Sequence, residues 1–231
     1  MHAPTINGFK IAIIKKPDAF LNSVIHNHGI YVALNYEKIY NQDRIVKECT
    51  NIGTGYVDGI GASIMLLFNG FKTKRYPGID LFLDILAFPK PKKIYLLGGK
   101  EYTINKAAEV INKSYPNVDV VGYHHGYFKE GYLLKNILPI IKKYKPDFIF
   151  VGMGSPLQEN IMFNLYKHYK SRYIGVGGSF KILTGEEVRA PIIIRKLGLE
   201  WLYRDILKPR RFQRDVNIPT FLINILKRKY K

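Results

Sequence analysis

Asp58 is the residue whose surroundings best suit proton transfer. It stands in the string Val57-Asp58-Gly59-Ile60-Gly61, directly after a short apolar run, so a predicted strand delivers its carboxylate to a turn made of glycines. A carboxylate placed in this way can accept the proton of a substrate hydroxyl. The same position also suits a helix N-cap, in which the carboxylate accepts backbone N–H groups. The local pattern leaves these two roles equally open.

Three arginines near the C-terminus are spaced for binding a diphosphate. Arg204, Arg211 and Arg214 differ by seven and three positions, so they would share one face of a continuous helix. Guanidinium groups bind phosphate oxygens through paired hydrogen bonds. Pro209 must interrupt or begin a helical turn here, however, and a solvated charged face is the alternative interpretation.

Other familiar chemistries find little support in the sequence. Cys49 is the only cysteine, which excludes an internal disulfide and a cysteine metal cluster. His124 and His125 have no carboxylate or cysteine at metal-ligand spacing nearby. The glycine-rich strings at 97–100 and 175–178 lack the spacing of a Walker loop and of a dinucleotide fingerprint. We therefore predict no metal site and no cofactor.

Alternating strands and helices are expected to carry these residues. The predicted strands between Lys92 and Gly178 are 94–97, 118–121, 148–151 and 173–176, and the predicted helices are 105–114, 132–143 and 159–168. Such alternation indicates βαβ units. The fold class is therefore α/β, with a Rossmann-like, mostly parallel sheet flanked by helices.

Glycine ends each of these apolar runs. Gly152 and Gly154 follow one run, and Gly177 and Gly178 follow another. In open parallel sheets the crevice beyond the carboxyl ends of the strands binds ligands, and glycine lets the backbone approach a phosphate or a sugar. We predict that these four glycines line a substrate pocket.

The two ends of the chain are less regular than its middle. Strands are predicted at 9–14, 30–34 and 55–57, and helices at 36–47, 62–69 and 79–87. Beyond Gly185 the strand signal vanishes, and a basic, aromatic, helical segment begins at Pro191. We predict an α/β core of residues 1–187 and a basic helical C-terminal appendage of residues 188–231.

The charge balance points to an anionic partner. Thirty-six Lys and Arg face eighteen Asp and Glu, a net charge of +18, which attracts anions at the expense of self-repulsion in the folded state. Residues 188–231 hold twelve Lys or Arg against three acidic residues, a net of +9. Half of the excess therefore lies in the predicted appendage.

The last stretch of the chain is typical of a helix on an anionic lipid surface. It mixes Phe221, Leu222 and Ile225 with Lys227 and Lys229. No apolar run approaches the roughly 20 residues of a spanning helix, and the apolar stretch at 11–14 is too short for a signal peptide. The sequence predicts a cytoplasmic protein, peripheral on the inner face of the cell membrane. An ordinary packed C-terminal helix is the alternative.

Several strings, each weak alone, form a specific set in their order and spacing. They are VDGIG at 57–61, RYPGID at 75–80, LLGGK at 96–100, GYHHGYF at 122–128, VGMGSPLQE at 151–159, IGVGGSF at 174–180, and GLEWLYR at 198–204 with PRR at 209–211. Together they resemble the WecG/TagA/CpsF family, glycosyltransferase family 26, over residues 31–214.

The resemblance implies an inverting transfer of an N-acetylmannosamine-type sugar, or its uronic acid, from a UDP donor. The implied acceptor is polyprenyl-diphosphate-linked N-acetylglucosamine, as in teichoic acid or enterobacterial-antigen-like polysaccharide synthesis. By position, Asp58 matches the proposed general base, Asn35 a polar active-site residue, and Gln158 a residue of the nucleotide-sugar pocket. The three tail arginines match those that close over the diphosphate of the family's donor, where they would stabilise the UDP leaving group.

Two further residues of the matching strings, Arg75 and Asp80, are assigned to substrate binding. The chain departs from the family pattern at Ala33, where the family has threonine, and at Tyr36, where it has proline. One active-site hydroxyl is therefore missing, which leaves the exact donor open.

Two alternatives to this function come from different observations. The high charge and the many tyrosines would also suit a nucleic-acid-binding module, but no recognition motif occurs, so we predict no nucleic acid partner. Ala33 instead suggests a catalytically altered family member with a different donor. The sequence leaves open whether the chain forms a homo-oligomer.

Overall fold

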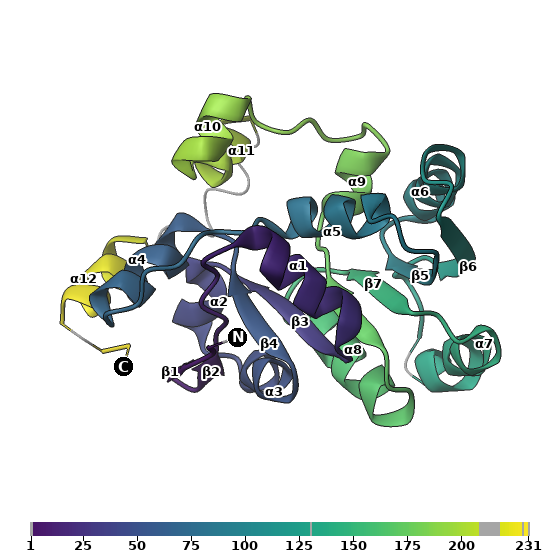
Figure 1. The fold of residues 1–231 in the computed structure, drawn as a ribbon, viewed down its shortest axis with the longest axis horizontal. Coiled ribbons are helices and arrows are strands. Elements are labelled where there is room, and N and C mark those ends of the chain that lie inside the picture. The colour runs from purple at the N-terminus through teal and green to yellow at the C-terminus, as the bar shows by residue number, and fades with distance from the viewer. Residues whose placement is uncertain (1, 130, 208–217, 228, 231) are drawn as a thin grey trace.

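A six-stranded parallel sheet forms the centre of the protein (Figure 1). The computed structural model describes residues 2–129, 131–207, 218–227 and 229–230. The strands are β3 (Gly29–Leu34), β4 (Thr54–Val57), β5 (Lys92–Gly98), β6 (Val118–His124), β7 (Phe148–Gly152) and β8 (Arg172–Gly175). They lie in the order β4-β3-β8-β7-β5-β6, and every neighbouring pair is parallel. A short antiparallel hairpin, β1 (Thr5–Ile6) and β2 (Phe9–Lys10), precedes the sheet.

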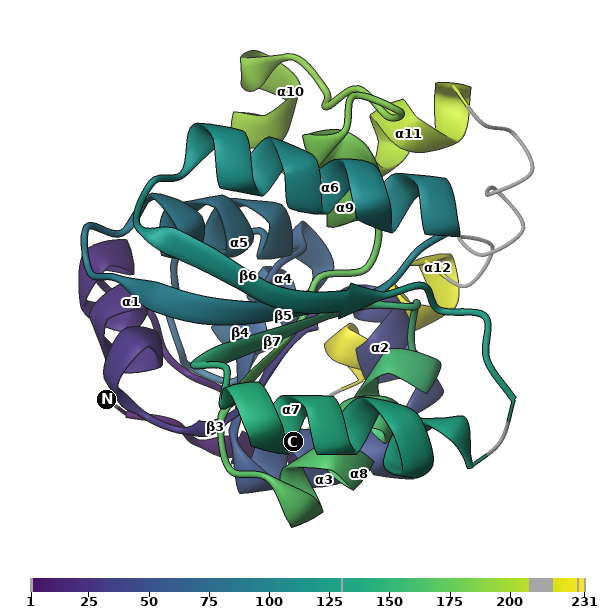
Figure 2. The same ribbon diagram turned by 90° about the vertical axis from the view of Figure 1, so that its right-hand side faces the viewer.

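Helices cover both faces of the sheet (Figure 2). One layer holds α1 (Pro17–His26), α5 (Gly78–Ala87), α6 (Glu101–Ser114) and α9 (Ser179–Leu183). The other holds α2 (Tyr36–Asn41), α3 (Arg44–Ile52), α4 (Ile60–Phe68), the π-helix η1 (Leu133–Ile137), α7 (Leu138–Tyr144), α8 (Leu157–His168) and α12 (Ile218–Leu226). The pair α10 (Ile192–Leu197) and α11 (Glu200–Leu207) lies beyond the first layer. The predicted α/β fold class is confirmed.

Some elements differ from the sequence prediction. The single helix expected at 36–47 is two helices, because Gln42 adopts a left-handed conformation (φ 56°) at the end of α2 and Asp43 is the N-cap residue of α3. The strand expected at 9–14 shortens to Phe9–Lys10, with one isolated bridge from Ile11 to Gly55. The prediction missed α1, although Pro17 stands in its first turn, a favoured position for proline.

Polar contacts join residues 188–231 to the rest of the protein. Arg189 Nη1 lies 2.6 Å from Asp80 Oδ1 at the start of α5. Arg75 Nη2 donates to Arg195 O at 3.0 Å and to Lys196 O at 3.1 Å, so its guanidinium caps the carbonyl end of α10. The boundary expected at residues 187 and 188 stays a prediction, but the tail's first helix is fixed to the core by charged groups.

The last helix, α12, packs one face on the core and exposes the other. Phe221 is 1% exposed, and its ring centroid lies 5.8 Å from that of Tyr36. A Cβ added to Gly61 would lie 2.8 Å from Tyr36 Cβ and 3.3 Å from Phe221, so glycine is needed for this approach. Leu222 and Leu226 remain exposed. The tail is therefore a packed helix that still offers an apolar surface.

Replacing Phe221 by Ala is expected to release α12 from the core. Truncating a buried Phe costs about 3–5 kcal/mol, which is a large loss for a helix of nine residues. The Leu222→Ala variant changes an exposed neighbour and serves as the control. Limited proteolysis should cleave the Phe221→Ala tail much faster than that of wild type or Leu222→Ala. Equal cleavage of all three would contradict this packing.

Candidate active site

Strands β4, β3 and β8 are neighbours at one end of the parallel sheet, with β3 between the other two. In open parallel sheets, ligands bind in the crevice outside the carboxyl ends of the strands. Asp58 follows β4, Asn35 follows β3, and Gly177 follows β8, so the fold brings these predicted residues to one edge.

Asp58 is held by the start of a neighbouring helix. Its Oδ1 accepts the backbone N–H of Gly78, the first residue of α5, at 2.9 Å, and its own N–H donates to Leu34 O at 3.0 Å. The N-cap residue of α4 is Gly59, which has no side-chain cap, so Asp58 does not cap the helix that follows it. The positive end of the α5 dipole attracts a negatively charged group at this position.

The start of α5 meets three strands at once. A Cβ added to Gly78 would lie 3.4 Å from Ala33 Cβ, 3.5 Å from the Tyr56 hydroxyl and 4.0 Å from Gly175 O. The Tyr56 hydroxyl is buried and has no hydrogen-bond partner among the described residues. Burial, reinforced by the Asp58 carboxylate, raises the pKa of Tyr56 well above its ordinary value. A neutral phenol and the methyl group of Ala33 therefore both lie near Gly78 at the start of α5.

Asn35 has a structural role that sequence reasoning did not assign. Its Oδ1 accepts the backbone N–H of Lys38 at 3.0 Å and so caps α2. A Cβ added to Gly59 would lie 3.4 Å from Asn35 Cβ, which places Asn35 beside the Asp58 loop. The predicted pair of polar residues is therefore brought together.

The predicted pocket glycines fall into two groups. A Cβ on Gly152 would lie 2.8 Å from both Gly177 O and the Phe180 ring, so Gly152 permits close packing between turns. Nothing lies within 4 Å of a Cβ added to Gly154, Gly177 or Gly178. These three glycines border open space at the carboxyl edge, whereas Gly152 does not.

Gln158 supports the glycine turn from inside the protein. Its side chain is buried, its Nε2 donates to Glu159 Oε1 at 3.0 Å, and its Oε1 accepts Gly177 N–H at 3.2 Å. Its predicted place in the nucleotide-sugar pocket stays a prediction. The observed contacts instead make it a link between α8 and the turn after β8.

A buried ion pair, which sequence reasoning missed, lies beneath the site. Lys38 Nζ lies 2.8 Å from Glu159 Oε1 and also donates to Ala33 O at 2.9 Å. Burial alone would raise the pKa of Glu159, but the Lys38 ammonium and the hydrogen bonds to the carboxylate hold it below its ordinary value. The two residues are 121 positions apart, so no local spacing could have revealed the pair.

The remaining predicted residues involve the C-terminal segment. Arg75 and Asp80, expected to bind substrate, are both engaged by residues of the tail, and their substrate roles stay predictions. Arg204 belongs to α11, but its side chain is not described. Arg211 and Arg214 lie outside the described residues.

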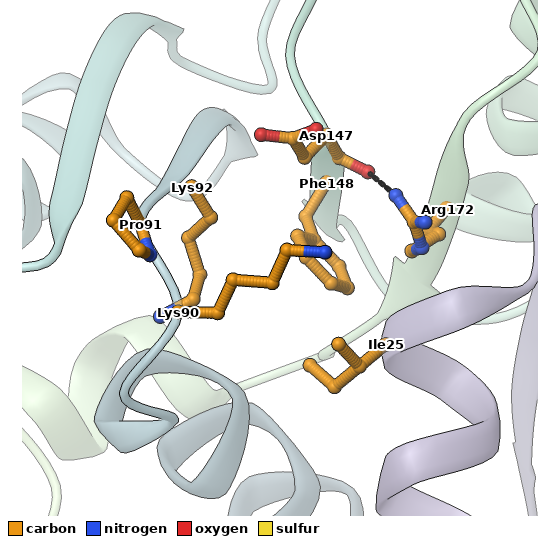
Figure 3. Close-up of a pocket in the computed structure, with 7 residues that line it drawn as sticks. All are labelled: Ile25, Lys90, Pro91, Lys92, Asp147, Phe148 and Arg172. Carbon is orange, nitrogen blue, oxygen red and sulfur yellow. Dashed lines mark hydrogen bonds between the residues drawn. The ribbon is translucent and has the colours of Figure 1, made fainter.

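A pocket at the opposite edge of the sheet contains none of the predicted residues (Figure 3). It is lined at the amino ends of β5, β7 and β8 by residues that include Lys92, Phe148 and Arg172. Arg172 Nη1 there donates to Asp147 O at 3.3 Å. Within the described residues, no group of three His, Cys, Asp or Glu side chains is placed to hold a metal ion.

Comparison with known proteins places this site in a family. The model of the glycosyl transferase WecG/TagA/CpsF family matches residues 6–231. The chain belongs to this family. A Bacillus subtilis protein named N-acetylglucosaminyldiphosphoundecaprenol N-acetyl-beta-D-mannosaminyltransferase is 38% identical over 175 residues, 74% of this chain and 67% of the relative. A Staphylococcus aureus protein of the same name is 38% identical over 160 residues, 68% of this chain and 62% of the relative.

Family membership confirms the resemblance drawn from the sequence strings and the predicted enzyme class, a glycosyltransferase. The matched residues include every strand of the parallel sheet. The matched stretch spans only about two thirds of the relatives' length.

The stability contributed by the buried pair should depend on pH in a defined direction. Because the folded-state pKa of Glu159 lies below its ordinary value of 4.5, this contribution is present above pH 4.5 and is lost as the pH falls through the folded value. At pH 7, Glu159→Gln leaves Lys38 buried without its counter-ion and should cost about 3–5 kcal/mol in the free energy of unfolding. Urea unfolding should show this difference shrinking below pH 4.5.

The exposed pair of Arg44 and Glu48, with 2.7 Å between Nε and Oε1, provides the control. Glu48→Gln should change the free energy of unfolding by about 0.5 kcal/mol or less at either pH, because water screens exposed pairs. A Glu159→Gln difference that stays constant from pH 7 to pH 3.5 would contradict the ion pair.

Proposed function

We propose that this chain transfers an N-acetylmannosamine-type sugar from UDP to N-acetylglucosamine on a polyprenyl diphosphate, with inversion at the anomeric carbon. The printed names of the two relatives describe an N-acetylmannosaminyl transfer to N-acetylglucosaminyldiphosphoundecaprenol. The product would serve cell-surface polysaccharide synthesis of the teichoic acid type.

The placement of Asp58 is the observation that carries this proposal. Its carboxylate lies at the carboxyl edge of the parallel sheet and is fixed by Gly78 N–H at one oxygen. Three unobstructed glycines lie at the same edge, after β7 and β8. A base must be held rigidly and must reach a substrate hydroxyl. The open glycines supply the backbone approach that a nucleotide sugar requires.

The reaction assigns opposite roles to the two sides of the site. The acceptor hydroxyl attacks the anomeric carbon while Asp58 takes its proton, and the bond from that carbon to the UDP β-phosphate oxygen breaks. Negative charge then develops on the departing UDP, and Arg204, Arg211 and Arg214 are proposed to stabilise it through paired hydrogen bonds. Gly154, Gly177 and Gly178 are proposed to admit the donor.

Ala33 bears on which donor the site accepts. Its methyl group and the orphan Tyr56 hydroxyl both lie near Gly78, so this corner offers a single phenolic hydroxyl where the family pattern provides a threonine. Both N-acetylmannosamine and its uronic acid are therefore candidate donor sugars.

Replacing Asp58 by Asn should abolish sugar transfer. The amide oxygen of the introduced asparagine can still accept Gly78 N–H, so the turn is kept, but the base is lost, with an expected rate loss of about 10²–10⁴-fold. Transfer from a panel of UDP-N-acetylhexosamines and their uronic acids to a synthetic polyprenyl-diphosphate N-acetylglucosamine, with EDTA present, measures this. We expect metal-independent product with wild type.

Asp147→Asn is the matched control for this experiment. Asp147 Oδ2 also accepts a backbone N–H, from Lys93 at 2.8 Å, but at the opposite edge of the same sheet. It should retain wild-type transfer. Undiminished product from Asp58→Asn would exclude Asp58 as the base, and no product from wild type with any donor would exclude the proposed reaction.

Membrane association is proposed to bring the enzyme to its lipid-linked acceptor. None of the described helices is long and apolar enough to cross a bilayer. Helices α4 and α12 lie side by side (Figure 1), and Asn69 Nδ2, just after α4, donates to Tyr230 O at 2.8 Å. Leu67 and Phe68 at the end of α4 are 60% and 51% exposed, and Leu226 of α12 is also exposed. We propose that these apolar side chains meet the bilayer, next in sequence to the basic residues Lys227 and Lys229.

Replacing Leu67 and Phe68 together by Ser should weaken binding to anionic vesicles by at least about tenfold, since burying one such side chain contributes about 1.5–3 kcal/mol. Ile192 and Ile193 of α10 are at least as exposed, and their double Ser variant is the control. Sedimentation with vesicles containing anionic lipid measures both. Loss confined to the α10 variant would place the docking face elsewhere.

A further inference from the structure

A continuous chain of hydrogen bonds runs beneath the site from β3 to the turn after β8. Lys38 Nζ donates to Ala33 O at 2.9 Å and to Glu159 Oε1 at 2.8 Å. The same Glu159 oxygen accepts Gln158 Nε2 at 3.0 Å, and Gln158 Oε1 accepts Gly177 N–H at 3.2 Å. This series of hydrogen bonds therefore links Ala33 of β3 to Gly177 in the turn after β8.

Each end of this chain controls a residue of the proposed site. The backbone N–H of Lys38 holds Asn35, which lies against Gly59 beside Asp58. At the other end, the Gly177 turn borders open space where the donor is proposed to lie. The backbone of Lys38 thus contacts Asn35, next to the Asp58 loop. Its side chain is linked through Glu159 and Gln158 to the Gly177 turn.

The ion pair is too deeply buried to act as a surface contact. The side chain of Glu159 is 0% exposed and that of Lys38 is 11% exposed. Taking two charges out of water costs more than a simple pair returns unless further hydrogen bonds satisfy them. Two apolar side chains would fill the same space without this cost. The additional hydrogen bonds to Ala33 O and from Gln158 therefore indicate that the ion pair fixes the relative positions of these groups.

We propose that Lys38 and Glu159, acting through Gln158, are positioning residues that fix the distance between the Asp58 base loop and the Gly177 donor turn. This role rests on the proposed transfer reaction. Neither residue touches the reacting atoms. Their effect is to keep the acceptor hydroxyl, held near Asp58, aligned with the anomeric carbon of a donor lying on Gly177.

The test compares three variants of the full chain in the transfer assay. Glu159→Gln and Lys38→Met each break the pair, whereas the double variant Lys38→Met/Glu159→Leu replaces it by apolar groups that pack without charge. We expect kcat to fall on the order of 10- to 100-fold in all three, because small displacements of reacting groups cost this much. Thermal unfolding should recover in the double variant while kcat does not.

Exchange of the Gly177 amide gives a readout that does not depend on activity. The Gly177 N–H is held by Gln158, so its hydrogen exchange, followed by NMR, should accelerate in all three variants. Glu48→Gln, which breaks an exposed pair on α3, should leave exchange, kcat and the thermal midpoint unchanged. A purely stabilising role would leave kcat and Gly177 exchange normal once the double variant restores stability.

The outcomes separate this inference from the proposed function. A double variant with wild-type thermal midpoint, kcat and Gly177 exchange overturns the positioning role, whatever the reaction. If wild type transfers no sugar, the proposed function fails, and Gly177 exchange still decides whether the ion pair controls the turn. Accelerated exchange with unchanged kcat would also overturn the inference, since the turn's position would then not matter to the reaction.

Discussion

Lys38 Nζ lies 2.8 Å from Glu159 Oε1 in a largely buried ion pair. Removing one partner would leave the other charge buried without a counter-ion. That constraint reaches far along the chain, because Lys38 belongs to α2 and Glu159 to the first turn of α8. The carboxylate is kept ionised by the ammonium beside it, and the ammonium is satisfied in turn by Ala33 O. Polar contacts thus join β3, α2 and α8, which also share one hydrophobic core.

Above this pair, close backbone packing sets the heights of the neighbouring turns. A side chain on Gly152 would clash with Gly177 O, so the ends of β7 and β8 approach as only glycine permits. The start of α5 then closes over β3, β4 and β8 at Gly78, whose N–H fixes Asp58. Two kinds of contact therefore position the turns of the site. One is the Lys38–Glu159 ion pair with its hydrogen bonds, and the other is the close backbone packing that glycine permits.

Much of this architecture could be predicted from the sequence. The strands are nearly continuous apolar runs ending in glycine, as sheets buried on both faces require, and this located the carboxyl edge and Asp58. The sequence did not distinguish Gly152, which is packed, from Gly177, which borders open space, because both follow strands and differ only in neighbours distant along the chain. The Lys38–Glu159 pair was missed for the same reason, since each residue alone resembles a solvated charge on an amphipathic helix.

The C-terminal segment contacts the core at two places near Asp58. One lies at the start of α5 and at Arg75, and the other at Tyr36 of α2. Asp80 of α5 holds Arg189, and Arg75 holds the end of α10, so the tail begins fixed beside the helix whose first N–H binds Asp58. Farther along, Phe221 of α12 packs on Tyr36 directly above Gly61, three residues after Asp58. Tyr36 thereby has a packing role. Both anchors attach to elements that adjoin Asp58, so the position of the tail is coupled to the part of the core that holds this carboxylate.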